Sequence, residues 1–336
     1  MNSNPTSDQL EQFRPLPDTS NDPSTELYPE GANGLPIGQQ LKDLALKPKS
    51  LTPPHLIPFI KTDLHALQAE QPLVVWFGHS SYLVHYRGAN ILVDPVFSGH
   101  SFPFPYTVKA FRGSDAFGVG DLPEIDLLIV TNNHYDHFDK KAISRLKDKT
   151  KQFCAPLGVG KYIESCGVDP DRVAELDCWS TIKPLPGASL TATPVQHFSG
   201  SGFQRTGMLW SSFVLKLDNY SLYLGGDSGY GAHFRIIGDS FGPFDLAVLE
   251  CGQYHAAWSS VHMLPEEMVQ AGKDLKAKCV LPVHWAKFAM ADHPWDEPIT
   301  RVVEAARAAG VTITTPLIGE RVVLDKYYPY MEWWKL

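Results

Sequence analysis

Residues 125–139 read IDLLIVTNNHYDHFD, an apolar run followed by two histidines and an aspartate. The run Ile125–Val130 has the composition of a strand that is covered on both faces. The segment after it places His134, Asp136 and His137 at the end of that strand. Neutral imidazole and carboxylate are ligands of zinc and related divalent metals. Three such groups within four positions predict a metal site rather than core packing.

Further metal-ligand side chains follow other apolar runs of the chain. His197, Asp227 and His284 each come just after a β-like segment. The ends of strands in one sheet can lie together although the sequence separates them widely, so we expect these three residues to converge on the 134–137 segment. The pattern predicts a metal-dependent hydrolase.

Length and composition narrow the class of protein. The 336 residues suffice for one large domain or two smaller ones, and 43% of them are hydrophobic. With 29 basic and 37 acidic residues, the formal net charge is −8. No basic surface to neutralise a nucleic-acid backbone is expected, so nucleic acid is not a predicted partner. The five cysteines form no CxxC pair, which favours reduced thiols.

The two ends of the chain differ in character from its middle. The start MNSNPTSDQLEQF has neither a basic beginning nor an apolar stretch, so no signal peptide is expected, and no apolar run is long enough for a spanning helix. The default expectation is a soluble cytoplasmic protein. Residues 1–50 are expected to form an irregular arm, and 51–336 a single hydrolase domain with an aromatic tail at 327–334.

The coarse pattern of strands and helices is mixed. A hairpin turn is expected at 87–90 and another at 218–219, the second between strands of alternating apolar residues. A short helix is expected at 56–68, entered at Pro58. Further helices are expected at 140–147, 158–165, 265–275 and 299–309. Antiparallel strand groups with helices in both halves predict two packed sheets flanked by helices.

Seven short motifs, taken together and in order, carry a family resemblance. They are WFGHSS (76–81), LVDPVFS (92–98), NNHYDH (132–137), QH (196–197), GGDSGY (225–230), HMLPEE (262–267) and VHW (283–285). The chain resembles the metallo-β-lactamase superfamily, and in particular the branch of N-acylphosphatidylethanolamine-hydrolysing phospholipase D and the ascorbate-6-phosphate lactonases. The resemblance implies an α/β fold, a four-layer αββα sandwich.

The resemblance also implies a ligand set for two divalent metals. By position, His134 and His197 would hold the first metal. Asp136, His137 and His284 would hold the second, and Asp227 would bridge the two, because its two oxygens can each face a cation. Zinc is the expected metal, as one or two ions, with manganese or iron as alternatives.

One position departs from the family pattern. Asn132 stands where the family has the first histidine of the motif, and an amide oxygen is a poorer zinc ligand than imidazole. The first metal position is therefore expected to be weakened. Three explanations stay open: a natural enzyme with one metal or two unequal metals, an engineered change that slows turnover, or a binding protein that has lost catalysis.

The implied reaction is metal-assisted hydrolysis, in which a cation lowers the pKa of its bound water from 15.7 to about 7 and so provides hydroxide. Asp136 would orient that nucleophile and accept its proton. His262 would contact the phosphate or protonate the departing oxygen. Four further residues are expected to support ligands or touch substrate: His79, Asp94, Tyr254 and His255.

The substrate is expected to be a small molecule or a lipid with a phosphodiester bond, as for a phospholipase D. A lactone or another carboxylic ester is the alternative on the same fold. The aromatic tail and the 102–104 loop favour a lipid-like substrate or a peripheral membrane contact, although docking of the tail on the body is the more common role of such a segment. Against a membrane role, the net charge is negative and no basic amphipathic helix is evident. The sequence leaves homo-oligomerisation open.

Overall fold

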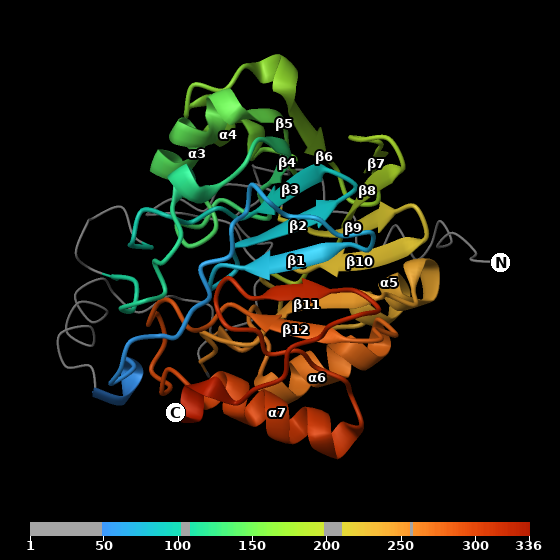
Figure 1. Ribbon diagram of the computed structural model, residues 1–336. Coiled ribbons are helices and arrows are strands. Elements are labelled where there is room, and N and C mark those ends of the chain that lie inside the picture. Colours follow the sequence, from blue (N-terminus) through green and yellow to red (C-terminus); the bar gives the residue numbers. More distant parts are fainter. Residues whose placement is uncertain (1–48, 102–107, 198–209, 256–257) are drawn as a thin grey trace, which may run out of the picture.

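The computed structural model describes residues 49–101, 108–197, 210–255 and 258–336 and contains two large β-sheets (Figure 1). The first sheet has seven strands, in the order β13 (Arg321–Val323), β1 (Leu73–Trp76), β2 (Tyr82–Tyr86), β3 (Ala89–Val93), β4 (Ile125–Ile129), β5 (Thr150–Pro156) and β6 (Val173–Leu176). The second has six, in the order β12 (Val280–Val283), β11 (Leu246–Glu250), β10 (Tyr220–Leu224), β9 (Ser212–Leu217), β8 (Ala188–Thr193) and β7 (Thr181–Ile182).

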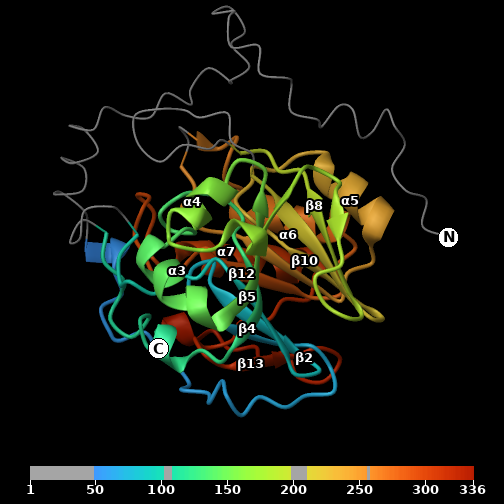
Figure 2. The same cartoon turned by 90° about the horizontal axis from the view of Figure 1, so that it is seen from above.

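Helices cover the outer side of each sheet, which gives four layers. In Figures 1 and 2, α3 (Lys140–Leu146) and α4 (Gly160–Glu164) lie beside β4 and β5 of the first sheet. The helices α5 (His233–Phe241), α6 (Pro265–Asp274) and α7 (Glu297–Ala309) lie on the side of the second sheet. The α/β four-layer sandwich is therefore confirmed. Short 3-10 turns complete the described elements: η1 (Lys49–Leu51), η2 (Val119–Asp121), η3 (Lys147–Lys149), η4 (Pro170–Arg172) and η6 (Trp333–Lys335).

The apolar strand β4 lies inside the first sheet, between two other strands. It pairs in parallel with β3 and with β5, and four of its five residues are buried. The helix after the 134–137 segment starts where Asp139 caps it: the Asp139 carboxylate accepts hydrogen bonds from the backbone N–H groups of Lys141 and Ala142. The same carboxylate accepts the N–H of Ser98 at 2.7 Å. The cap thus fixes both the helix and the chain after β3.

The hairpin turns follow from local sequence. The β2–β3 connection is Arg87-Gly88, with φ values of 48° and 82°. Two left-handed residues in a two-residue loop match the twist of the strands. The turn is shorter than the expected 87–90, because Ala89 and Asn90 already pair in β3. The expected two-residue turn at 218–219 between β9 and β10 is present.

The expected helix at 56–68 is wrong. This segment is irregular, and two of its backbone N–H groups donate to distant parts of the chain. The N–H of Ile57 donates to the carbonyl of Arg112, and the N–H of Ile60 donates to Ile318, both at 2.8 Å. Partners far away in the sequence have replaced the helical ones, which a pattern of apolar residues cannot reveal.

The aromatic tail docks on the body next to the strand end that carries His284. Trp333 and Trp334 are 1% and 4% exposed, and the Trp333 ring stacks on Trp285 at 5.0 Å. Tyr330 is 52% exposed. The expected arm at 1–50 falls almost wholly outside the described residues, and so does the 102–104 loop. None of the helices in the described ranges is long and apolar enough to pass through a bilayer.

Candidate metal centre

The candidate ligands converge where strand ends from both sheets meet. The 134–137 segment follows β4, His197 follows β8, Asp227 follows β10 and His284 directly follows β12. Gly226 permits the close approach of these loops, because a Cβ there would lie 2.9 Å from the Ser211 carbonyl oxygen. Groups from positions 150 residues apart therefore share one buried region.

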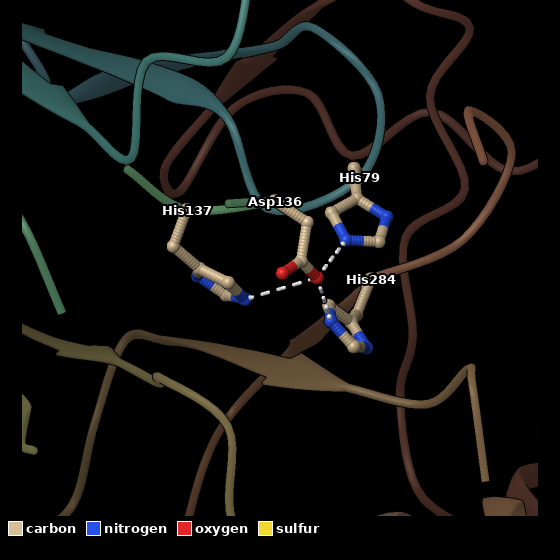
Figure 3. Close-up of side chains that lie close together, drawn as sticks. All are labelled: His79, Asp136, His137 and His284. Atoms are coloured by element: carbon tan, nitrogen blue, oxygen red, sulfur yellow. Dashed lines mark hydrogen bonds and ion pairs between the residues drawn. The ribbon is translucent and has the colours of Figure 1, made fainter. Parts of the chain in front are cut away.

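One cluster gathers around the carboxylate of Asp136 (Figure 3). Its Oδ2 lies 2.9 Å from Nε2 of His79, 3.1 Å from Nε2 of His284 and 3.7 Å from Nε2 of His137. All four side chains are buried, with at most 5% of any of them exposed. The second oxygen, Oδ1, takes part in no hydrogen bond within the described ranges. Asp136 therefore keeps one oxygen for a further contact.

The carboxylate of Asp227 lies between two pairs of imidazoles. Its Oδ1 is 3.0 Å from Nε2 of His137 and 3.3 Å from Nε2 of His284. Its Oδ2 is 3.7 Å from Nε2 of His197 and 3.9 Å from Nδ1 of His134. Each oxygen thus faces a different half of the site. This is the arrangement of a carboxylate that can serve two cations at once.

The side-chain amide of Asn132 is not arranged as a metal ligand. Its Oδ1 accepts the backbone N–H of His134 at 2.9 Å, while its Nδ2 lies 3.5 Å from Oδ2 of Asp227. The oxygen that could bind a metal is occupied by the backbone, and the amino group faces the carboxylate. The structure therefore gives a physical reason for the weakness expected at this position.

Asp94 holds His137 from behind. Its Oδ2 is 2.7 Å from Nδ1 of His137 and also accepts the hydroxyl of Thr131, while its Oδ1 accepts the backbone N–H of Thr131. An imidazole that donates from Nδ1 keeps Nε2 available as a ligand atom. The contact therefore orients His137 Nε2 toward Asp136 and Asp227.

Glu250 is a site residue that the motif analysis missed. It is the last residue of β11 and only 2% exposed. Its Oε2 lies 2.7 Å from Nδ1 of His262 and 3.3 Å from Nδ1 of His284. The signal was present, because Glu250 follows an apolar run just as the other candidates do. It was overlooked because the family motifs quoted above do not include it.

His79 also lies closer to the centre than expected. It was expected to support a ligand or touch substrate, but its Nε2 is within hydrogen-bond distance of Asp136 and its ring is fully buried. Together with Asp136, His137 and His284 it forms a group with metal-ligand spacing. The loop Gly78–Ser80 follows β1, and nothing in its local sequence shows that it turns toward Asp136. Only the buried position of His79 in the structure reveals that it belongs to this group.

Tyr254 and His255 lie at the edge of the site. The Tyr254 hydroxyl donates to Glu297 of α7 at 2.6 Å, and its ring stacks on His293. The hydroxyl is therefore already used within the protein. His255 packs against Trp258, with 4.5 Å between ring centroids, and lies 3.8 Å from Asp292.

Two imidazoles of the cluster, His137 and His284, lie in a field that favours positive charge. Burial lowers the pKa of His137, but Asp227, Asp94 and Asp136 outweigh it and raise that pKa well above its usual value. Burial likewise opposes protonation of His284, yet Asp227 and Asp136 raise its pKa to about 9. The imidazoles in turn hold the pKa of Asp227 well below normal against the effect of burial. A field that favours protons on these rings also favours a divalent cation.

The residues present fit such a cation. Nε2 of His137 and Oδ1 of Asp227 are completely buried and form no hydrogen bond, although they lie 3.0 Å apart. Buried polar atoms without partners are uncommon unless a ligand satisfies them. Mixed nitrogen and oxygen donors suit zinc, and also manganese or iron. Three groups have ligand spacing: one around Asp136, one of His134, His197 and Asp227, and one of Asp227, Glu250, His262 and His284 that shares a residue with each of the others.

Comparison with known proteins finds a matching family model and similar relatives. Residues 89–285 match the family model described as a beta-lactamase superfamily domain. An uncharacterized protein of Mycobacterium tuberculosis is 35% identical over 298 residues, covering 88% of this chain and 80% of that protein. The mitochondrial N-acyl-phosphatidylethanolamine-hydrolyzing phospholipase D of Saccharomyces cerevisiae is 32% identical over 248 residues, 70% of this chain and 52% of that protein.

A solved structure shares the fold. Igni18, a metallo hydrolase from the archaeon Ignicoccus hospitalis, superposes with a TM-score of 0.58 at 21% identity. The match covers 76% of this chain and 100% of that one. The fold described above is therefore that of a known metallo hydrolase.

Proposed function

This chain belongs to the metallo-β-lactamase superfamily as a metal-dependent hydrolase, and we propose that the bond it hydrolyses is a phosphodiester. Similarity to the yeast phospholipase D, which extends over 70% of this chain, supports that choice of bond. The observation that carries the proposal is the position of Asp227, whose two oxygens face two separate pairs of imidazoles. A bridging carboxylate of this kind suits a reaction assisted by two cations.

Two sets of residues would hold the cations. His134, His197 and Asp227 form the smaller set, which lacks a ligand at Asn132. Asp136, His137, His284 and the shared Asp227 form the fuller set, in which each carboxylate lies within 3.7 Å of Nε2 of both imidazoles. When bound, a divalent cation lowers the pKa of water and stabilises negative charge that develops on a phosphoryl oxygen.

The chain's own residues orient the reaction. Asp136 is held through Oδ2 by His79 and His284, so its Oδ1 is available to position the attacking water and accept its proton. Most side chains of the centre are at most 5% exposed, but those of His134 and His262 are 19% and 15% exposed. Substrate therefore approaches over these two rings.

His262 would contact the phosphoryl group or protonate the departing oxygen. Its Nδ1 is held by Glu250, and its Nε2 forms no hydrogen bond within the described part of the chain. Burial opposes protonation of this ring, but Glu250 outweighs burial and raises its pKa. A proton is therefore available on the ring at the exposed side of the site.

The test is an assay with bis(p-nitrophenyl) phosphate after loading with Zn²⁺ or Mn²⁺. We expect turnover by the parent protein and a loss of at least about 100-fold in Asp227→Ala, because that carboxylate serves both cations. The surface variant Asp148→Asn is the matched control and keeps full activity. Turnover of a lactone panel but not of the phosphodiester would refute the proposed bond. No turnover of either, even in Asn132→His, would leave a binding protein.

A further inference from the structure

Glu250 joins three loops of the site through a single buried carboxylate. Its Oε1 accepts the backbone N–H of Ser228, the residue after Asp227, at 2.7 Å. Its Oε2 faces Nδ1 of His262 at 2.7 Å and Nδ1 of His284 at 3.3 Å. The loops after β10 and β12 and the segment before α6 therefore meet at this side chain.

The contact with His262 determines which of its ring nitrogens carries the proton. A carboxylate is only an acceptor, so the Nδ1 of His262 must be the donor in this pair. Within the described residues Nδ1 has no other hydrogen-bond partner, whereas Nδ1 of His284 also lies 3.2 Å from the Gly252 carbonyl. His262 therefore depends on Glu250 for its tautomer, and His284 depends on it less.

Glu250 and His262 differ in how far their side chains are exposed. The Glu250 side chain is 2% exposed and that of His262 is 15% exposed. The His262 ring lies 5.1 Å from the His197 ring and 5.3 Å from the His284 ring, between centroids. Glu250 thus sits behind a ring that borders both ligand groups and reaches the surface.

We propose that Glu250 is a positioning residue that holds His262 with Nδ1 protonated, so that Nε2 is the atom presented to substrate. The assignment deepens the proposed function, because it rests on His262 acting at the phosphoryl group or the leaving oxygen. Glu250 itself touches no substrate. It acts through His262, and its contact with Ser228 fixes the distance between the Asp227 loop and that ring.

Glu250→Gln replaces a carboxylate, which only accepts hydrogen bonds, by an amide that can also donate, and it keeps the size of the side chain. If the amide oxygen stays on the Ser228 N–H, the amide nitrogen faces His262 Nδ1, which must then accept. The proton moves to Nε2. The reverse orientation would place two N–H donors against each other at Ser228, so the first orientation is favoured and the proton is expected on Nε2.

Nitrogen-15 NMR of the metal-loaded protein with labelled histidine reads the tautomer directly. At alkaline pH, where the ring is neutral, we expect the parent protein to show His262 protonated at Nδ1 and Glu250→Gln to show it protonated at Nε2. The His262→Gln variant identifies the signal by its loss. An Nε2-protonated ring in the parent, or an unchanged ring in Glu250→Gln, would overturn the proposal.

Kinetics of the same variants provide a second readout. We expect Glu250→Gln to lower kcat by about 10- to 100-fold with little change in KM, and to add little further loss in a His262→Gln background. Glu304→Gln on the surface of α7 is the matched control. Independent, additive losses would contradict action through His262. Should the parent hydrolyse no phosphodiester, the proposed function fails, while the NMR result still decides the role of Glu250.

Discussion

At the scale of single residues, the site combines buried charge with unusual backbone. His79, Asp94 and His284 have positive φ values of 52°, 43° and 69°. Residues other than glycine rarely adopt this backbone conformation, and each residue held in it costs about 1–3 kcal/mol of stability. The surrounding hydrogen bonds hold them there. Three strained residues within one polar cluster are typical of a functional site.

The hydrogen bond between Asp94 and His137 leads to a prediction about metal affinity. Asp94→Asn replaces a carboxylate that accepts from His137 and twice from Thr131, so His137 loses the acceptor that fixes its ring. We expect zinc affinity to fall about 10- to 100-fold, measured by competition with a chromophoric chelator. The Asp148→Asn control keeps the parent affinity. Equal affinities in the parent and Asp94→Asn would show that this hydrogen bond does not prepare the ligand.

Lys287 provides a prediction for pH. Burial lowers its pKa to about 8, against the opposing effect of Asp139 and Asp115, and its Nζ donates to the Phe77 and Val96 carbonyls. The unfolded chain retains the ordinary value of 10.5. Between these values the unfolded state binds more protons, so the free energy of unfolding gains up to about 1.4 kcal/mol per pH unit as pH rises.

Denaturant unfolding across that pH window tests the expectation. Lys287→Met removes the titrating group, so the difference between parent and variant should grow with pH and then level off. Lys273→Met on the surface of α6 serves as the control and should follow the parent. A parent–variant difference that is constant with pH would contradict the account of Lys287.

The sequence indicated which side chains lie close together wherever a residue follows a strand, and their metal-binding role stays a prediction. His134, Asp136, His137, His197, Asp227 and His284 lie together as expected, because strand ends are visible in an apolar pattern. Glu250 obeyed the same rule and was overlooked. The position of His79 could not be foreseen, because nothing local shows that its loop turns toward Asp136.

At the scale of elements, strands and capped helices were predictable and irregular segments were not. The helix α6 begins at Pro265, with the Glu267 side chain accepting the Leu264 N–H at 2.9 Å, and both features are legible in the sequence. Residues 56–68 have a helical pattern of apolar residues but bond to Arg112 and Ile318 instead. Such partners, more than 50 residues away, leave no local signal.

The aromatic tail is the element with the clearest energetic role. Trp333 stacks on Trp285, the neighbour of His284, and donates from its indole to the Pro316 carbonyl. Trp333→Ala should reduce the free energy of unfolding by about 3–5 kcal/mol, measured by denaturant titration. Tyr330→Ala, at a residue 52% exposed, should change it by less than about 0.5 kcal/mol. Similar losses in both variants would show that the tail is not docked as described.

At the scale of the whole molecule, two sheets with helices outside them bring both halves of the chain to one centre. Among the candidate ligands, the 134–137 segment follows a strand of the first sheet, whereas His197, Asp227 and His284 follow strands of the second. The site therefore exists only in the folded chain, and metal binding and folding are coupled. The family motifs made this convergence predictable. The departure from the family pattern at Asn132 was visible in the sequence too, but not the hydrogen bond that turns its amide toward His134.

Elemental analysis of the purified, metal-loaded and dialysed protein tests the central claim, that carboxylates and imidazoles from both sheets hold divalent cations around Asp227. We predict about one tightly held equivalent in the parent, about two in Asn132→His and less than one in Asp227→Ala. A parent protein that retains no metal, with Asn132→His and Asp227→Ala indistinguishable from it, would contradict the account.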